Sequence, residues 1–502
     1  MKDALFSSHT KGFLLLVLFV MAGLGIRLYD LTDPPLDFHS TRQMLSLHKA
    51  RGMYYQTRTD VPSEQRAFAI QQWKFGASVE PAFLERMVAF TYQMTGEKIW
   101  VGRVYSSIFW VIGAFFLFLL VRNFTKWAGA LTTTAFFLFL PYAVSASRSF
   151  QPDPLMIMLV ILFWWAVYRW AKNPESYRWA VIAGLFGGFA IFIKLSAAFF
   201  VIAGGLGAAL GSASLQELLR KPQLYVMSVL GALPGAVYIV YGIYVAGFLA
   251  QQFGGRFIPS LYLSPAYYLG WIGMVNLVMG GIPLVLGLLG LYFVQERSDF
   301  RFLVGLWAGY ALSGLYFTYH ISTHYYYHLI LIPIVGLSIG PAVDGFSAAL
   351  AKSPRFDRWM MLPLFIALIG LFLVIWNTRA ILKSNDYRDE PARWVEISER
   401  VEAEARLIGL TQDYGMRLAY WGWRPTAVWP RSGDIYYHGN RGAEFEFAQL
   451  FEDLALKRDY FLVTDFEELE KQPLLKDHLN KTYPLAVSGD GYLIYDLQNP
   501  LD

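Results

Sequence analysis

The chain contains eleven apolar segments that are long enough, or nearly long enough, to cross a lipid bilayer as helices. The hydrocarbon core of a bilayer is about 30 Å thick, and a helix needs about 20 apolar residues to span it. The segments lie at 12–29, 100–121, 127–147, 154–170, 177–193, 195–212, 223–249, 271–294, 302–319, 325–343 and 359–378. Charged residues make up only 16% of the chain, whereas soluble proteins carry about 25%. The sequence therefore predicts a mainly α, polytopic membrane protein with about 11 transmembrane helices.

One boundary between these segments rests on a single charged residue. Residues 179–210 contain only Lys194 as a charge and are too long for one span. The two halves on either side of Lys194 are both short. Either the two helices extend beyond these limits, or Lys194 dips into the membrane.

The charges between the segments predict an orientation. Basic residues recur in alternate, short connections, and such connections stay in the cytoplasm. They lie at 1–11, 122–126, 169–178, 220–221, 297–301 and 352–358. We therefore expect a cytoplasmic N-terminus and an extracytoplasmic C-terminal region. The first segment lacks an A-x-A site before Arg27, so we expect a retained helix rather than a cleaved signal peptide.

Two regions are too polar to lie in a membrane. Residues 30–99 include amphipathic patterns at 41–55 and 81–94, which predict helices on the outer membrane surface. Residues 385–502 alternate between apolar runs and polar turns, with strands expected at 407–410 and 460–463, a helix at 467–479 and a hairpin across 485–495. We therefore expect a transmembrane domain over 1–384, with 30–99 as its first extracytoplasmic loop, and a small extracytoplasmic α/β domain over 385–502.

Composition and charge placement exclude several functions. The chain has no cysteine, which excludes disulfides and thiol catalysis. No dense basic patch predicts nucleic acid as a partner. No charged residue falls near the centre of a predicted span, although transporters of polar solutes usually keep one there. The unusual polar residues gather at the outer connections, which favours an enzyme at the outer surface over a transporter, a flippase or a scaffold.

The first outer loop supplies two candidate carboxylates. Asp37 begins the run Asp37-Phe38-His39-Ser40-Thr41-Arg42-Gln43, directly after the first span. It could act as a general base if it reaches a hydroxyl, or it could cap a helix that begins near Ser40. Glu80 precedes Pro81, where it could serve as a second carboxylate or interact with a helix dipole.

The other candidates lie at three outer turns. Arg148 and Asp153 follow the third span, where they could form an ion pair or line a cavity for phosphate and sugar. Lys194 could neutralise a lipid phosphate or extend to the lipid headgroups. The turn at 319–328 has histidines at 320, 324 and 328, which could bind a metal or belong to an interfacial aromatic belt.

The order of these motifs resembles the GT-C superfamily of membrane glycosyltransferases, which includes dolichyl-phosphate-mannose protein mannosyltransferases and lipid A aminoarabinose transferases. The first loop matches D-x-H-x-x-R-Q, Glu80 precedes a proline, residues 147–153 match S-R-x-x-x-P-D, Lys194 follows the fifth span, and an aromatic turn leads to Pro333. The resemblance covers about residues 13–340. It departs at Phe38, where many relatives have a second acidic residue. That departure weakens the case for a metal site, and a divalent metal (Mg²⁺ or Mn²⁺) remains open.

The resemblance implies an inverting glycosyltransferase of glycan biosynthesis in the cell envelope, within the bacterial cytoplasmic (inner) membrane. The donor would be a polyprenyl-phosphate sugar, with undecaprenyl phosphate as carrier, and the acceptor a hydroxyl of a glycan, lipid or protein. A polyprenyl-linked lipid or solute transporter or flippase is the alternative. The implied catalytic residues are Asp37 and Glu80. The implied donor phosphate-binding residues are Lys194, Arg148 and Arg256. The implied substrate-binding residues are His39, Arg42, Asp153, His324 and Tyr325.

Overall fold

The computed structural model describes residues 9–76, 80–249, 256–350, 361–384, 386–439, 441–442 and 445–501. The chain packs into two compact units. One is drawn from residues 1–31, 78–84 and 101–385, and we call it the membrane unit. The other is drawn from residues 32–77, 85–100 and 386–502, and we call it the α/β unit.

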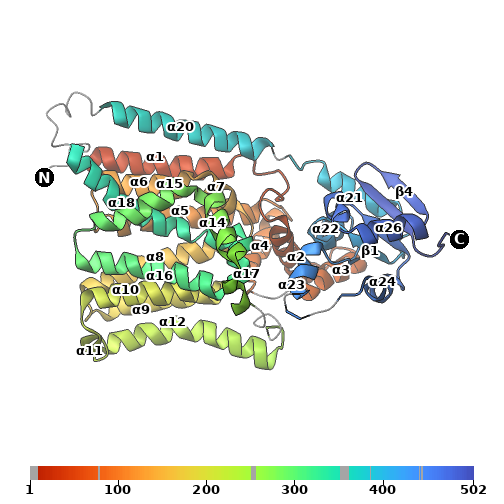
Figure 1. Cartoon of the computed structure of the whole chain (residues 1–502), viewed down its shortest axis with the longest axis horizontal. Helices are drawn as coiled ribbons and strands as arrows, with labels where there is room; N and C mark the ends of the chain where they lie inside the picture. Colours follow the sequence, from red (N-terminus) through yellow and green to blue (C-terminus); the bar gives the residue numbers. More distant parts are fainter. Residues whose placement is uncertain are drawn as a thin grey trace. The chain divides into compact units, whose positions relative to one another are not determined.

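Each of the eleven apolar segments corresponds to a helix or a bent pair of helices in the membrane unit. They are α1 (His9–Leu28), α5 (Val101–Val121), α6 and α7 (Trp127–Phe139, Pro141–Arg148), α8 (Asp153–Lys172), α9 (Tyr177–Ile193), α10 (Ala197–Ser212), α12 (Pro222–Val240), α14 and α15 (Pro265–Met279, Gly281–Gly290), α16 (Arg297–Tyr316), α18 (Leu331–Leu350) and α20 (Met361–Ser384). Short helices connect them: α11 (Leu215–Leu218), η1 (Tyr241–Val245), η2 (Pro259–Leu263), η3 (Leu291–Phe293), α17 (Thr318–Thr323) and η4 (Tyr325–His328). The long helices run side by side along a common direction (Figure 1).

These helices confirm the predicted polytopic, mainly α fold class. In the described part of the chain, six helices are long and apolar enough to cross a membrane, and eight spans result if each bent pair counts as one. The pairs α6–α7 and α14–α15 bend by 58° and 93°. The apolar helices α9 and α10 have only 17 and 16 residues, because the chain leaves the helix between Ile193 and Ala197. The break predicted at Lys194 is therefore present.

Glycines allow close approach of the helices where α10 crosses α16. A Cβ atom on Gly305 would lie 2.6 Å from the carbonyl oxygen of Ala203, and one on Gly207 would lie 2.8 Å from that of Arg301. Apolar side chains gain little by leaving lipid for a protein interior, so membrane helices associate through close packing of small residues. The two glycines therefore set the separation between α10 and α16.

The α/β unit is built around a five-stranded sheet of order β2-β1-β3-β5-β4. The strands are β1 (Leu407–Leu410), β2 (Thr426–Val428), β3 (Tyr460–Val463), β4 (Leu485–Gly489) and β5 (Tyr492–Asp496). β1 is parallel to β2 and β3, and β5 is antiparallel to β3 and β4. The predicted strands at 407–410 and 460–463 and the final hairpin are confirmed, whereas β2 was not predicted.

Helices make up most of the rest of the α/β unit, to which all but the first two residues of α4 belong. They are α2 (Ser40–Gln56), α3 (Ser63–Phe75), α4 (Phe83–Thr95), α21 (Glu390–Glu399), η5 (Gln412–Gly415), α22 (Met416–Trp421), α23 (Ser432–Gly439), α24 (Phe447–Ala455), α25 (Phe466–Glu470) and α26 (Pro473–Thr482). Every residue of β1 is buried, as expected for a parallel strand with both faces covered. Its side chains alternate between a cluster around Trp429 and Phe461 and another around Trp394 and Leu418. The single helix predicted at 467–479 is wrong, because Pro473 starts a second helix there.

Candidate functional site

The membrane unit places an ion pair at the break between α9 and α10. Lys194 directly follows the last residue of α9, and its Nζ lies 2.8 Å from Oδ1 of Asp153 in the first turn of α8. The two side chains are only 12% and 4% exposed. The Lys194 ammonium also lies over the rings of Tyr326 and Tyr327, at 5.3 and 5.7 Å from their centroids. The chain thus holds a largely buried cation against one carboxylate and two aromatic rings.

This pair retains unused hydrogen-bonding capacity. Oδ2 of Asp153 is buried and has no hydrogen-bond partner among the residues that the structure describes. A cavity of about 20 Å³ lies between Asp153, Lys194, Ser196, Ser313, Tyr326 and Tyr327. That volume is enough for about one water molecule. A larger ligand therefore needs movement of the lining side chains, and the two tyrosines of the short η4 helix form one wall.

Arg148, the other basic candidate near Asp153, ends α7. Its side chain is buried, and its Nη2 donates to the Asp30 carbonyl at 3.0 Å. Arg27 is buried near it, with Nε donating to Ser147 Oγ at 2.6 Å and Nη1 to the Gly23 carbonyl at 2.7 Å. The two guanidinium groups lie close enough to repel each other. The S-R-x-x-x-P-D turn thus brings two buried cations to one end of α1 and α7.

The turn that contains α17 places His320 and His324 where the charges of Arg256 and Lys194 also act. The His320 ring lies 5.3 Å from that of His324. Burial, and to a smaller extent the charges of His324, Arg256 and Lys194, together lower the pKa of His320 to about 3. Arg256, His324 and Lys194 therefore act on the same half-buried ring.

The neighbouring residues of this turn pack as aromatic and structural groups. Tyr325 packs edge-on against Tyr142, with ring centroids 5.6 Å apart. His328 uses both ring nitrogens, one with the Tyr310 hydroxyl at 2.6 Å and one with the Ile321 carbonyl at 2.8 Å. Those two hydrogen bonds leave His328 no free nitrogen for a metal.

Asp37, the first candidate base, belongs to the α/β unit. Its side chain is partly exposed, and Gln43 Nε2 donates to its Oδ1 at 3.4 Å. The helix α2 begins at Ser40, as predicted, but its N-cap is His39, with φ of 44° and no side-chain capping bond. The N-cap residue of α2 is therefore His39 and not Asp37.

The remaining first-loop candidates surround Asp37 or lie in the other unit. His39 packs edge-on against the Phe38 ring at 4.9 Å, and Arg42 lies in the first turn of α2. Burial raises the pKa of Tyr387, and the negative charge of Asp37 raises this pKa further, so the tyrosine lies near the carboxylate. Glu80 belongs to the membrane unit, is partly exposed and interacts electrostatically with Tyr238 of α12.

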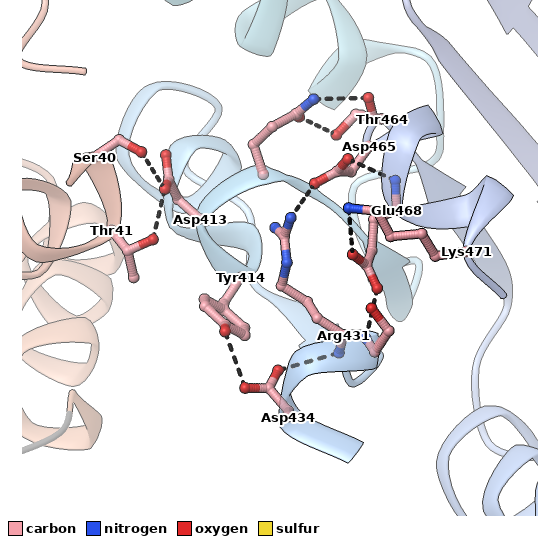
Figure 2. Close-up of polar contacts among 12 residues, drawn as sticks. Ser40, Thr41, Asp413, Tyr414, Arg431, Asp434, Thr464, Asp465, Glu468 and Lys471 are labelled. Atoms are coloured by element: carbon pink, nitrogen blue, oxygen red, sulfur yellow. Dashed lines mark hydrogen bonds and ion pairs between the residues drawn. The ribbon is translucent and has the colours of Figure 1, made fainter. Parts of the chain in front are cut away.

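Sequence reasoning missed the polar residues that follow the parallel strands of the α/β unit. Asp413 follows β1 and Asp465 follows β3, and Figure 2 shows each of them bonded to side chains of other residues. The available signal was a polar run directly after each predicted buried strand, because ligands of α/β sheets collect at that edge. The aromatic residues Tyr420 and Trp421 lie at the end of α22. The Arg51 guanidinium lies 3.3 Å from the Tyr420 ring centroid and covers that face.

A metal site does not emerge from these residues. Within the described ranges, no group of three or more His, Cys, Asp or Glu side chains is arranged to hold a metal ion. Phe38 follows Asp37 where a second carboxylate would be needed.

The arrangement of apolar helices with polar residues at their breaks defines a multi-pass membrane protein that carries an α/β unit. The family model described as dolichyl-phosphate-mannose-protein mannosyltransferase matches residues 80–241. The crystal structure of ArnT from Cupriavidus metallidurans bound to undecaprenyl phosphate is similar, with TM-score 0.58, 13% identity, and 97% of this chain and 98% of that chain covered. The archaeal oligosaccharyltransferase AglB from Archaeoglobus fulgidus, in complex with an inhibitory peptide and a dolichol-phosphate, is also similar, with TM-score 0.56, 12% identity, and coverages of 97% and 74%.

No curated protein sequence matches the chain. The family-model match covers residues 80–241, and the two structural likenesses extend over 97% of the chain. They confirm the predicted resemblance, and the chain has the fold of the GT-C superfamily of membrane glycosyltransferases.

Proposed function

We propose that this protein is an inverting glycosyltransferase that moves a sugar from a polyprenyl-phosphate donor to an acceptor hydroxyl on the outer face of the bacterial cytoplasmic membrane. The observation that carries the proposal is Lys194, a largely buried cation at the break between the apolar helices α9 and α10. The charges of Lys194 and Arg256 both act on His320 in the turn that contains α17. A lipid-linked phosphate needs this combination of apolar surroundings and a fixed cation. Two proteins of the same fold were solved with undecaprenyl phosphate and with dolichol-phosphate, which supports this donor class.

The leaving group determines what the membrane unit has to supply. In a single displacement, the acceptor oxygen forms a bond to the anomeric carbon while the bond from that carbon to the phosphate oxygen breaks. The departing polyprenyl phosphate gains negative charge, and fixed cations stabilise such charge as it develops. Lys194, Arg148 and Arg256 are the cations proposed for this role. Asp153, whose buried Oδ2 has no hydrogen-bond partner among the described residues, is proposed to accept a hydrogen bond from a sugar hydroxyl. His324 and Tyr325 are proposed to line the substrate side.

The acceptor must lose a proton in the same step. Asp37 is proposed to take the proton from the attacking hydroxyl, because its carboxylate is partly exposed and is oriented by Gln43. His39 and Arg42 flank it and are proposed to bind the substrate. Glu80 is the second candidate for the base. We derive no step through a metal, and transfer assays with EDTA and with Mg²⁺ or Mn²⁺ measure any metal dependence directly.

The test is sugar transfer by the full-length protein in proteoliposomes. A panel of radiolabelled undecaprenyl-phosphate sugars serves as donors and total bacterial membrane lipid as acceptor. We expect transfer by the wild type, its loss in Asp37→Asn, and its retention in Asp60→Asn, which removes an exposed carboxylate of the same unit. Persistent transfer in folded Asp37→Asn would move the base elsewhere. A wild type that transfers no sugar but carries a fluorescent polyprenyl-phosphate lipid across the bilayer would establish the flippase alternative instead.

A further inference from the structure

Two backbone segments of the α/β unit adopt left-handed conformations where they approach each other. Before α2, His39 has φ of 44°. After β1, three consecutive residues have positive φ: Asp413 at 53°, Tyr414 at 56° and Gly415 at 77°. Residues other than glycine adopt this region only when their surroundings hold them there, and such residues gather at functional sites.

The Asp413 carboxylate joins the two segments. Its Oδ1 accepts hydrogen bonds from Ser40 Oγ at 2.6 Å and from Thr41 Oγ1 at 2.7 Å, as Figure 2 shows. Its Oδ2 accepts from Arg417 Nε at 2.5 Å, and Asp413 is only 4% exposed. Arg417 is fixed in turn by Glu390 Oε2 at 2.8 Å. The start of α2 is therefore bonded to a carboxylate that is itself held on its far side.

A second contact holds the segment 33–41 at its other end, at Asp33. Asp33 Oδ1 accepts the backbone N–H of Tyr387 at 2.9 Å and lies 3.7 Å from Arg388 Nη1. Residues 33–41 are thus anchored at both ends to the C-terminal part of the chain. Asp37 lies between the two anchors.

We propose that Asp413 is a positioning residue for glycosyl transfer. Through Ser40 and Thr41 it fixes the first turn of α2, and that turn fixes the Asp37 carboxylate. The inference rests on the proposed function, in which Asp37 is the base. A displacement of about 1 Å at a catalytic group can reduce the rate about 100-fold, so this hydrogen-bonded anchor affects turnover rather than donor binding.

Asp465 provides a matched control on the neighbouring strand. It follows β3 as Asp413 follows β1, and it too is largely buried. Its side chain accepts the Glu468 N–H at 3.1 Å and pairs with Arg431 at 2.7 Å (Figure 2). Both of these partners belong to the C-terminal part of the chain, so the loss of this carboxylate leaves the first loop untouched.

The test removes the anchor from the α2 side, so that Asp413 and Arg417 keep their own pairing. In the double variant Ser40→Ala/Thr41→Val, we expect kcat to fall about 10- to 100-fold, with the KM for the donor changed less than about twofold. Amide hydrogen exchange over residues 33–41 should become faster. The double variant Ser40→Thr/Thr41→Ser keeps a hydroxyl at both positions, and its kcat should equal that of the wild type. Asp465→Asn should lower thermal stability and leave kcat unchanged. Asp413→Ala in the Ser40/Thr41 double variant should cause no further loss of kcat.

The outcomes separate this inference from the proposed function. Wild-type kcat, or unchanged exchange over residues 33–41, in Ser40→Ala/Thr41→Val would overturn the positioning role. If Asp37→Asn abolishes transfer while the double variant retains it, only the positioning role fails. If Asp37→Asn itself retains transfer, the base assignment and the positioning role fail together.

Discussion

Replacing Lys194 with methionine separates a structural ion pair from a phosphate-binding cation. The substitution keeps the length of the side chain and removes its charge. Asp153, only 4% exposed on its side chain, then loses the ammonium group at 2.8 Å. Removing one partner of a buried ion pair costs about 3–5 kcal/mol, because the remaining charge is uncompensated. We therefore expect a large loss of thermal stability in Lys194→Met.

Adding Asp153→Asn to this variant removes the uncompensated charge. A buried ion pair replaced as a whole is often neutral in stability, so Lys194→Met/Asp153→Asn should recover most of the lost stability. It should not recover donor binding. A hydrogen bond from a charged group contributes about 1.5–3 kcal/mol, which corresponds to an increase of about 10- to 150-fold in the Kd for undecaprenyl phosphate.

The assay measures thermal unfolding in detergent together with binding of undecaprenyl phosphate by native mass spectrometry. Lys172→Met is the matched control. Lys172 lies 3.5 Å from a buried carboxylate, Asp299, but its own side chain is 52% exposed. This control should change neither property strongly. Wild-type affinity for undecaprenyl phosphate in Lys194→Met/Asp153→Asn would refute the role of Lys194, and the pair would then be purely structural.

Two further predictions concern stability. The pKa of His48 lies at about 4, because burial and the nearby Arg51 lower it more than a hydrogen bond with the Met416 carbonyl raises it. Because His48 titrates near 6.5 once unfolded, the unfolded chain binds more protons as the pH falls, and the free energy of unfolding should decrease by about 2 kcal/mol from pH 7 to pH 5. Thermal unfolding of wild type and His48→Gln at the two pH values checks this, and an equal pH dependence in both would contradict it. Gly305→Val should destabilise the membrane unit by about 1–3 kcal/mol, because its Cβ would lie 2.6 Å from the Ala203 carbonyl oxygen. Gly273→Ala is the control, since a Cβ there meets no atom within 4 Å, and equal melting temperatures for the two variants would contradict the packing argument.

The membrane helices were predictable because bilayer thickness sets a minimum apolar length, which is a local property of sequence. The strands β1 and β3 were predictable for a similar reason, since their short apolar runs are buried on both faces. Local signals were weaker at β2 and α3, two elements that were not predicted from the sequence. β2 has only three residues, and α3 is polar along most of its length. Pro473 did carry a signal, and a helix boundary there could have been predicted.

The partners of the candidate residues could not be predicted in this way. Ser40 and Asp413 are bonded across 373 positions of sequence, and Asp153 and Lys194 across 41. Neither spacing is a helical or strand period, so no local rule pairs these residues. Tertiary packing sets their pairing. The order of motifs along the sequence predicts which residues take part, but not which of them are bonded to each other.

The structure also gives the reason that such pairs require a well-defined fold. A buried carboxylate is costly unless donors satisfy it. Asp413 meets that requirement with two hydroxyls of the first loop and one guanidinium of its own segment. The hydroxyls can reach it only if the first loop and the strand β1 are both in place. A single carboxylate therefore couples the folding of the C-terminal sheet to the geometry of the loop that carries Asp37, and a variant that weakens this coupling should reduce turnover before it unfolds the protein.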